Sequence, residues 1–431
     1  MSKSLEEIHR SIPILEGISK WKKLLAFAGP GYLVAVGYMD PGNWATDLAG
    51  GSKYGYALLG VVAISGIMAM ILQHLSLKLG IVTGKDLAQA CRDHYSPIVR
   101  KILWILAEIA ITACDLAEVI GSAIALQLLF NIPIVLGVII TGFDTLLLLL
   151  LQSRGVRYLE ALVISLITVI VACFGIEIFL SRPDIAQLVT GFIPTVELFK
   201  NQEMLYIAIG ILGATVMPHN LYLHSALVQS RDFGDGHSNK KEAIKYATID
   251  SNIALGLATL VNSAILIVSA ATFHSRGMTD IAEIQDAYKL LTPLLGAGAA
   301  STLFALALLA SGHNSTITGT MAGQVVMEGF VNLHIAPWMR RLITRLLAII
   351  PAIVIVVLYG THGLAQLLVF SQVVLSMQLP FAVIPLVKFT SENKYMGQFV
   401  NSPFLKTISW TIATIIVTLN IWLIGKIIIS F

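Results

Sequence analysis

Apolar residues dominate long stretches of this sequence, and short polar segments separate the stretches. About 20 consecutive apolar residues suffice to cross the hydrocarbon core of a bilayer as one α-helix. The pattern predicts eleven such helices. They cover approximately residues 25–49, 56–81, 99–129, 132–152, 158–180, 204–229, 246–273, 294–327, 342–359, 363–387 and 404–430.

Composition strengthens this interpretation. Of the 431 residues, 56% are hydrophobic and 12% are charged, whereas soluble proteins carry about 25% charged residues. We therefore expect an all-α polytopic membrane protein. The polar segment 1–24 lacks the short apolar core and cleavage site of a secretory signal, so we expect no removable signal peptide. The three cysteines lie far apart and predict neither a disulfide nor a zinc site.

Basic residues set the expected orientation. Most of the 28 Lys and Arg residues fall on one side when the helices alternate across the membrane, and cytoplasmic loops are enriched in these residues. This places the N-terminus in the cytoplasm and the C-terminus, after an odd number of helices, outside. The short loops leave no room for a separate soluble domain. Together with the short termini, they favour the plasma membrane of a prokaryote, the inner membrane of a bacterium.

Polar residues interrupt the first apolar run at Asp40-Pro41-Gly42-Asn43. A charge at the centre of a membrane helix costs about 2.5–3.5 kcal/mol on insertion scales. Proline removes a backbone donor and glycine loosens the chain, so we expect the helix to break here. Such a break is tolerated in lipid only where it lines a cavity or is buried in protein.

The sixth run contains a second interruption, Val216-Met217-Pro218-His219-Asn220. When the two are superimposed, proline falls on proline, asparagine on asparagine, and Met217 opposite Asp40. Broken helices at corresponding positions of two halves indicate a transporter built from inverted repeats. We expect a cytoplasmic segment at 1–24, a first repeat at 25–180, a second repeat at 204–387, and an extra helix at 404–430.

The donor atoms at the breaks predict a metal site. Asp40 offers a carboxylate, Asn43 an amide oxygen, and unwinding before Pro218 frees the carbonyl of Ala214. Met217 offers a thioether, a soft ligand that suits transition metals but not Mg²⁺ or Ca²⁺. The alternatives are a helix cap for Asp40 and ordinary packing for Met217. The pairing of the two motifs favours a transition-metal substrate.

Three acids, Glu108, Asp115 and Glu118, share one face of the third predicted helix. Acids that line one face of a membrane helix are typical of proton relays. The alternative is that the acids form ion pairs with arginines of the ninth predicted helix, namely Arg340, Arg341 and Arg345. The two interpretations are compatible, because ion-paired acids can still relay protons.

Two histidines, His219 and His224, follow the second break. Because imidazole titrates near neutral pH, we expect a role in gating or proton handling rather than metal ligation.

These residues carry a resemblance to a known family. The motifs at 40–43 and 214–224, with Thr316–Thr320 and Ser371–Phe381, resemble the Nramp proton-coupled divalent-metal transporters along nearly the whole chain. The resemblance implies a leucine-transporter-like fold of about 11 helices, with 5+5 inverted repeats and broken helices 1 and 6. It also implies Mn²⁺ or Fe²⁺ as substrate, H⁺ as coupling ion, alternating access, and no cofactor.

The resemblance further implies particular residues. Asp40, Asn43, Met217 and the carbonyl of Ala214 match the family's metal ligands. The tenth helix of the family supplies a glutamine, for which Gln366 is the first choice and Gln372 the second. An arginine of the ninth helix lies on the family's proton pathway, and we select Arg341 among the three. One departure concerns His313 and Asn314, where the family usually has Gln and Ser.

Three other classes of protein fit the sequence less well. An amino-acid or organic-cation symporter of the same fold is disfavoured by the carboxylate at the first break. A channel is disfavoured because the chain lacks repeated filter segments. An enzyme is disfavoured because no nucleophile–base–acid group or nucleotide motif stands out. We expect the metal ion, protons and the lipid bilayer to be the partners, with neither nucleic acid nor an obligatory protein partner.

Overall fold

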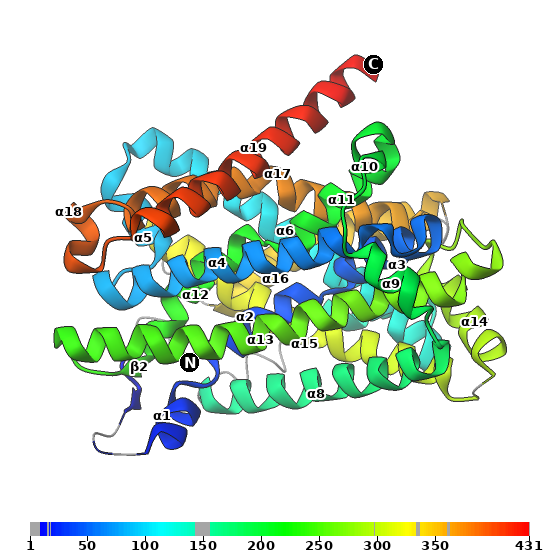
Figure 1. Cartoon of the computed structure of the whole chain (residues 1–431), viewed down its shortest axis with the longest axis horizontal. Helices are drawn as coiled ribbons and strands as arrows, with labels where there is room; N and C mark the ends of the chain where they lie inside the picture. Colours follow the sequence, from blue (N-terminus) through cyan, green and yellow to red (C-terminus); the bar gives the residue numbers. More distant parts are fainter. Residues whose placement is uncertain are drawn as a thin grey trace.

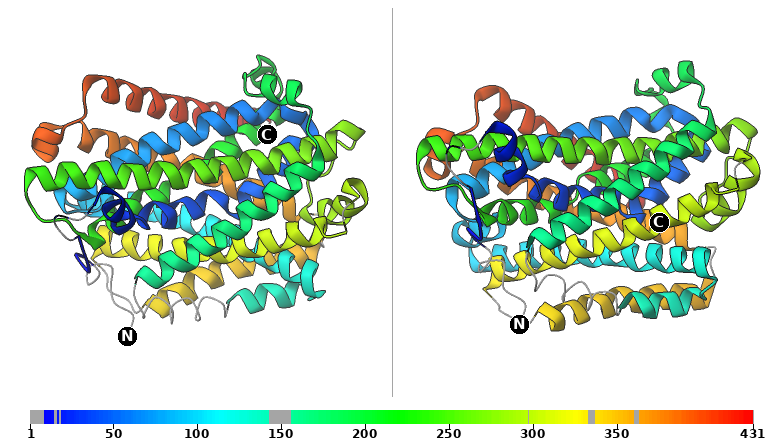
Figure 2. Two further views of the ribbon diagram at one scale, coloured as in Figure 1. Left: turned by 60° about the horizontal axis from the view of Figure 1, so that its bottom comes forward. Right: turned by 90° about the horizontal axis from the view of Figure 1, so that it is seen from below.

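The chain forms a bundle of long helices that run roughly along one direction (Figures 1 and 2). The fold comes from a computed structural model, which describes residues 9–14, 17, 19–142, 156–296, 298–332, 337–359 and 363–430. Within these ranges the regular structure is helical apart from one two-residue pair of strands. The all-α prediction is therefore confirmed.

The first half of the chain contains short helices around the break, followed by longer ones. They are α1 (Lys20–Phe27), α2 (Pro30–Ala35), the 3-10 helix η2 (Val36–Met39), α3 (Pro41–Tyr54), η3 (Gly55–Leu58), α4 (Leu59–Thr83), α5 (Leu87–His94), α6 (Pro97–Phe130) and α8 (Val156–Ser181).

The second half begins with two short helices outside the bundle, and a broken helix follows them. Its elements are α9 (Ile185–Gly191), α10 (Glu197–Lys200), α11 (Gln202–Thr215), α12 (Pro218–Leu227), η4 (Val228–Ser230), α13 (His237–Thr272), η5 (His274–Arg276), α14 (Ile284–Leu295), α15 (Ala300–Val331), α16 (Pro337–Tyr359), α17 (Leu364–Thr390), α18 (Asn393–Met396), η6 (Gly397–Phe399) and α19 (Pro403–Ser430).

By length and composition, seven helical stretches of the described chain can cross a membrane. The difference from the eleven predicted runs has identifiable causes. The stretch Pro41–Thr83 counts once, although Gly55 turns the chain between α3 and α4 with φ 59°. The predicted run 132–152 lies partly outside the described residues. The apolar part of α16, Leu342–Leu358, is shorter than the others. Helix α15 is long enough, but its second half is rich in polar residues and it is not among the seven.

The connections gather at the two ends of the bundle. Segments expected in the cytoplasm, namely α1, α5, α18 and the loop before α13, lie at one end in Figure 1, whereas α9, α10 and α14 lie at the other. At the first end, β1 (Ile12–Pro13) pairs in parallel with β2 (Arg231–Asp232). The N-terminal segment is thereby attached to the loop that follows the second break.

Helices from the two halves pack against each other throughout the core. Helix α15 packs against α6 and α8, α13 against α3 and α4, and α11 against α3. Both interrupted helices therefore lie inside the bundle, where other helices surround them. The predicted division into repeats at 25–180 and 204–387 remains a prediction.

Candidate metal site at two helix breaks

The first break lies where the sequence predicts it. Helical geometry ends at Met39, and Asp40 adopts an extended conformation (φ −69°, ψ 165°) before Pro41 begins α3. Its Oδ1 accepts a hydrogen bond of 2.8 Å from the backbone N–H of Asn43. Asp40 is therefore also a helix cap, but this contact occupies only one of its two oxygens.

Neighbouring helices bind the carbonyls that the first break frees. The amide of Asn262 on α13 donates to the carbonyl of Tyr38 at 2.9 Å, and the hydroxyl of Ser311 on α15 donates to the carbonyl of Met39. Because buried carbonyls are costly to leave unpaired, these two side chains stabilise the interruption. The break is therefore held in place by side chains of the neighbouring helices α13 and α15.

The second break has the same form. Helix α11 ends at Thr215, Val216 leaves the helical region (φ −116°, ψ 78°), and Met217 caps α12 in an extended conformation. In a continuous helix the carbonyl of Ala214 would accept from residue 218, but Pro218 has no N–H. This carbonyl therefore lacks its usual helical donor, and its role as a metal ligand remains a prediction.

The two breaks lie against each other inside the bundle. A methyl group on Gly37 would overlap the side-chain amide of Asn220, so the segments approach closely. That amide donates to the sulfur of Met217 at 3.6 Å. Met217 itself is fully buried and packs against Ala110, Ala113, Cys114 and Leu375.

Several oxygens at the breaks are buried without a hydrogen bond. Within the described part of the chain, Asp40 Oδ2, Asn43 Oδ1 and Asn220 Oδ1 have no partner, and these residues are at most 1% exposed. Since buried polar atoms are normally paired, such a group of oxygens beside a thioether is suited to receiving a cation.

Of the two glutamines considered on the tenth helix, Gln372 rather than Gln366 lies against the first break. Gln372 is fully buried, and a methyl group on Gly42 would overlap its side-chain amide. Gln366 is exposed in the first turn of α17. Six residues at 100° each leave the two side chains about 120° apart around the helix axis, so they face different sides of the helix. The selection of Gln366 is thereby corrected.

Asp47 is a buried acid that the sequence analysis did not single out. It is 1% exposed, and its Oδ2 lacks a hydrogen-bond partner among the residues described. The spacing of Asp40, Asn43 and Asp47 is i, i+3, i+7, which follows one face of a helix. That spacing was the signal that could have identified it.

The acids of α6 meet the arginines of α16. Arg340 donates to both carboxylate oxygens of Glu108, at 3.2 and 3.1 Å, and the indole of Trp104 donates to Glu108 at 3.1 Å. Farther along α6, Arg345 lies 3.5 Å from Glu118 and donates to Thr316 at 2.6 Å. The side chain of Arg341 lies outside the described residues.

Asp115 and Glu118 both point toward α15. A Cβ on Gly319 would lie 2.9 Å from Glu118 Oε1 and 3.4 Å from Asp115 Oδ1. The structure thus brings these acids to one helix interface, with the nearby Arg345 also donating to the carbonyl of Asp115 at 3.5 Å. The predicted shared face and the alternative of ion pairing both hold.

The two histidines have different surroundings. Both ring nitrogens of His219 are buried with no hydrogen bond to any described residue. His224 lies 2.9 Å from Gln73 through Nδ1, and Gln73 donates to the hydroxyl of Tyr38 at 2.5 Å. His224 is therefore connected to the residues just before the first break.

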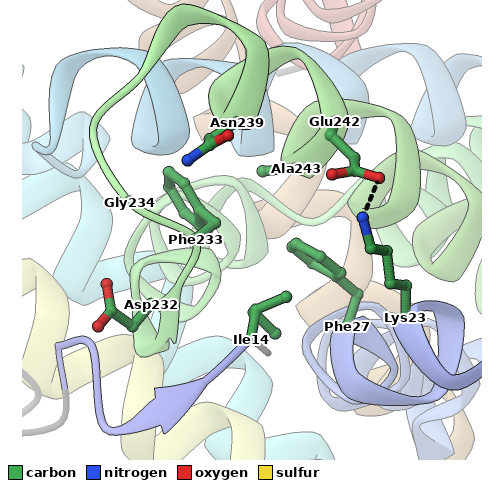
Figure 3. Close-up of a pocket in the computed structure, with 9 residues that line it drawn as sticks. All are labelled: Ile14, Lys23, Phe27, Asp232, Phe233, Gly234, Asn239, Glu242 and Ala243. Carbon is green, nitrogen blue, oxygen red and sulfur yellow. Dashed lines mark hydrogen bonds and ion pairs between the residues drawn. The ribbon is translucent and has the colours of Figure 1, made fainter. Parts of the chain in front are cut away.

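A surface pocket of about 230 Å³ lies elsewhere, beside α1 and the start of α13 (Figure 3). Lys23 and Glu242 form an ion pair of 2.7 Å on one side of it, and the aromatic rings of Phe27 and Phe233 line it. None of the residues from the two breaks contributes to its lining. This pocket is therefore separate from the candidate metal site.

Comparisons with known proteins identify a family and close relatives of this chain. The model of the family described as "Natural resistance-associated macrophage protein-like" (Nramp) matches residues 31–426. A protein of Nostoc sp. named divalent metal cation transporter MntH is 61% identical over 421 residues, covering 98% of this chain and 95% of its own length. One from Bradyrhizobium diazoefficiens with the same name is 59% identical over 424 residues, covering 98% and 94%.

Solved structures show the same architecture. Crystal structures of the Eremococcus coleocola manganese transporter match with a TM-score of 0.90 and 46% identity, covering 97% of this chain and 90% of theirs. The transporter Mhp1 matches with a TM-score of 0.57 at 12% identity, covering 100% and 93%. The Mhp1 likeness concerns the fold alone.

Proposed function

The chain belongs to the Nramp family of membrane transporters, and from this we propose that it imports divalent transition metals, Mn²⁺ or Fe²⁺, by symport with protons. The carrying observation is that Asp40 and Asn43 have buried, unpaired oxygens at the first break. This break packs against the second one through Gly37 and Asn220, and Asn220 contacts the thioether of Met217. Relatives named as divalent metal cation transporters and as a manganese transporter support the same substrate class.

The donor set suits a cargo that must be released. Asp40 supplies one negative charge, and Asn43, Ala214, Met217 and Gln372 supply neutral donors. No group of three or more His, Cys, Asp or Glu side chains within the described ranges is placed to hold a metal ion. A resident metal centre of high affinity uses several charged or imidazole ligands, so a single carboxylate favours transient binding.

The thioether supplies the selectivity. Met217 has apolar neighbours and one weak hydrogen bond, the 3.6 Å contact from Asn220. A metal that binds sulfur compensates for the loss of this contact, whereas Mg²⁺ gains little from a thioether and dehydrates reluctantly. We infer that the site discriminates against the abundant hard cations in this way.

Protons follow the acids of α6 in the proposed cycle. A metal ion beside Asp40 favours its ionised form, so a proton held there leaves when the metal binds. Asp115 and Glu118 near Gly319, and then Glu108 with Arg340, provide the next sites. Ten residues separate Glu118 from Glu108, or about 15 Å along the helix, enough to bridge half of the bilayer.

The two breaks act as the hinges of alternating access in this proposal. Each provides an extended residue between two helical segments, and Asn262 and Ser311 bind the carbonyls beside the first. We place the N-terminus in the cytoplasm and the C-terminus outside, in a bacterial inner membrane, because of the positive-inside asymmetry. The single carboxylate at the first break argues against an organic anion as substrate.

Uptake of Mn²⁺ into proteoliposomes in excess Mg²⁺ or Ca²⁺ tests the substrate and the selectivity. We expect the unaltered protein to ignore the hard cations and Met217→Ala to become sensitive to them. Met68→Ala, which removes another buried methionine, serves as the control and should remain insensitive. Equal competition by Mg²⁺ in all three proteins would refute the role of the thioether.

Asp40→Ala and Asp115→Asn separate binding from coupling. We expect Asp40→Ala to abolish metal uptake. Asp115→Asn should reduce proton flux more than Mn²⁺ binding, because its carboxyl lies on α6 near Glu118. Full Mn²⁺ uptake by Asp40→Ala would overturn the site, and equal loss of flux and binding in Asp115→Asn would make Asp115 a structural residue.

A further inference from the structure

A cavity of about 620 Å³ lies between α6 and α16, and none of the proposed metal donors lines it. Its lining is mainly apolar and includes Trp104, Leu116 and Leu347, and it contains the ion pair of Glu108 with Arg340. This volume falls within the range of small-molecule sites in proteins, about 300–1,000 Å³. The cavity is therefore large enough to hold a small-molecule ligand.

The cavity opens toward the lipid. Residues on both sides of its mouth are exposed: Ile105 by 51% and Ile109 by 44% on α6, and Ile343 by 50% and Leu347 by 53% on α16. In a membrane-spanning bundle these side chains face acyl chains. The cavity is thus a lateral groove that a lipid can enter without crossing the protein.

The length of the groove matches one leaflet. Twelve residues separate Trp104 from Leu116, which corresponds to about 18 Å along α6. Half of the hydrocarbon core of a bilayer is roughly 15 Å thick. Trp104 lies at the end of the groove nearer the start of α6, and tryptophan is enriched at the level of the headgroups.

Positive charge lies just beyond that end. Arg100 and Lys101 precede Trp104 and Ile105 by one helical turn, and Lys101 is exposed. The Nε of Arg100 is buried and has no hydrogen-bond partner in the described chain. Arg340 is already paired with Glu108, so the charge left to attract an anion belongs to Arg100 and Lys101.

We propose that this groove binds one anionic phospholipid, with an acyl chain between α6 and α16 and the phosphate against Arg100 and Lys101. Basic sites between membrane helices are known to select anionic headgroups. In the orientation proposed above, the lipid belongs to the cytoplasmic leaflet. The lining of this site contains none of the proposed metal donors, and the acyl chain of the lipid covers the Glu108–Arg340 pair from the bilayer.

Native mass spectrometry of the purified protein tests the site directly. After mixing with phosphatidylglycerol or phosphatidylethanolamine, we expect one phosphatidylglycerol molecule to be retained in preference to phosphatidylethanolamine. Thr112→Trp, which fills the lining of the groove, should lose this lipid. The double variant Arg100→Gln/Lys101→Gln should retain both lipids equally.

Matched controls come from α19, on another face of the bundle. Ile421→Trp adds the same bulk at an exposed position, and Lys406→Gln removes an exposed basic residue; both should behave as the unaltered protein. Equal retention of the two lipids by the unaltered protein, or undiminished retention by Thr112→Trp, would overturn the proposal.

A second measurement avoids variants that fold poorly. Phosphatidylglycerol brominated on its acyl chains should quench the fluorescence of Trp104, with the contribution of Trp104 obtained by comparison with Trp104→Phe. We expect quenching at a lower fraction of brominated phosphatidylglycerol than of brominated phosphatidylethanolamine. Identical curves for the two lipids would show that only unselective lipid contacts the groove.

Discussion

Gly213 allows α11 to pack directly on the backbone of α17, one residue before the carbonyl proposed to bind metal. A Cβ at this position would lie 2.7 Å from the backbone nitrogen of Ser376 and closer still to the carbonyl oxygen of Gln372, whereas ordinary contact begins at 3.4 Å. We predict that Gly213→Ala forces the two helices apart by at least about 0.7 Å. Inserting a group into a packed core in this way costs about 1–3 kcal/mol.

The same displacement should weaken metal binding. Ala214 follows the substituted residue on α11, and Gln372 lies on α17 at the other side of the helix contact. Separating the two helices therefore moves these two proposed donors away from each other. If about 1.4 kcal/mol of the strain energy is subtracted from the free energy of Mn²⁺ binding, the Kd for Mn²⁺ rises tenfold. The variant should therefore lose both thermal stability and affinity.

Gly175→Ala is the matched control, because a Cβ there meets no heavy atom within 4 Å. Its free energy of unfolding should increase by up to about 1 kcal/mol, because alanine has a higher helix propensity than glycine. It should bind Mn²⁺ normally. Thermal unfolding in detergent and calorimetric titration with Mn²⁺ measure the two effects. If Gly213→Ala matched Gly175→Ala in both measurements, the close packing of α11 on α17 would not position the donors.

Two further variants test other contacts. Arg345→Gln leaves the fully buried Glu118 without its cationic neighbour, and breaking a buried pair costs about 3–5 kcal/mol; chemical unfolding should show this loss, and an unchanged midpoint would contradict it. His94 lies outside the membrane spans, and burial together with Lys388 lowers the pKa of its imidazole; its Nε2 accepts from the Lys388 ammonium at 3.1 Å. The stability that this histidine contributes is complete above its unfolded pKa of about 6.5 and is lost as the pH falls below that value. His94→Gln should therefore reduce the change in the unfolding midpoint between pH 7.5 and 5.5. The same change in the variant and the unaltered protein would show that His94 does not cause the pH dependence.

The sequence was sufficient to locate the two helix breaks because their cause is local. Pro41 and Pro218 each remove a backbone donor, and a carboxylate or a thioether stands just before each of them. Helix periodicity also placed Glu108, Asp115 and Glu118 on a shared face. These inferences needed only the order of residues along one helix.

Contacts between helices were harder to predict. Gln366 and Gln372 lie on the same helix, and only the packing of α17 against Gly42 distinguishes them. The partner of Glu108 likewise depends on how α6 and α16 are aligned, which brings Arg340 to it. The two-residue strands β1 and β2 are too short for any periodicity to reveal.

The charge of the donor set has an electrical consequence for the proposed cycle. With one carboxylate among its donors, the site carries −1 when it is empty and ionised, and +1 when it holds a divalent metal. Moving one elementary charge through 100 mV is worth about 2.3 kcal/mol. A membrane potential that is negative inside therefore draws the loaded site inward and drives the empty site outward, so both steps favour accumulation. A second carboxylate ligand would make the loaded site neutral and remove the pull on the inward step.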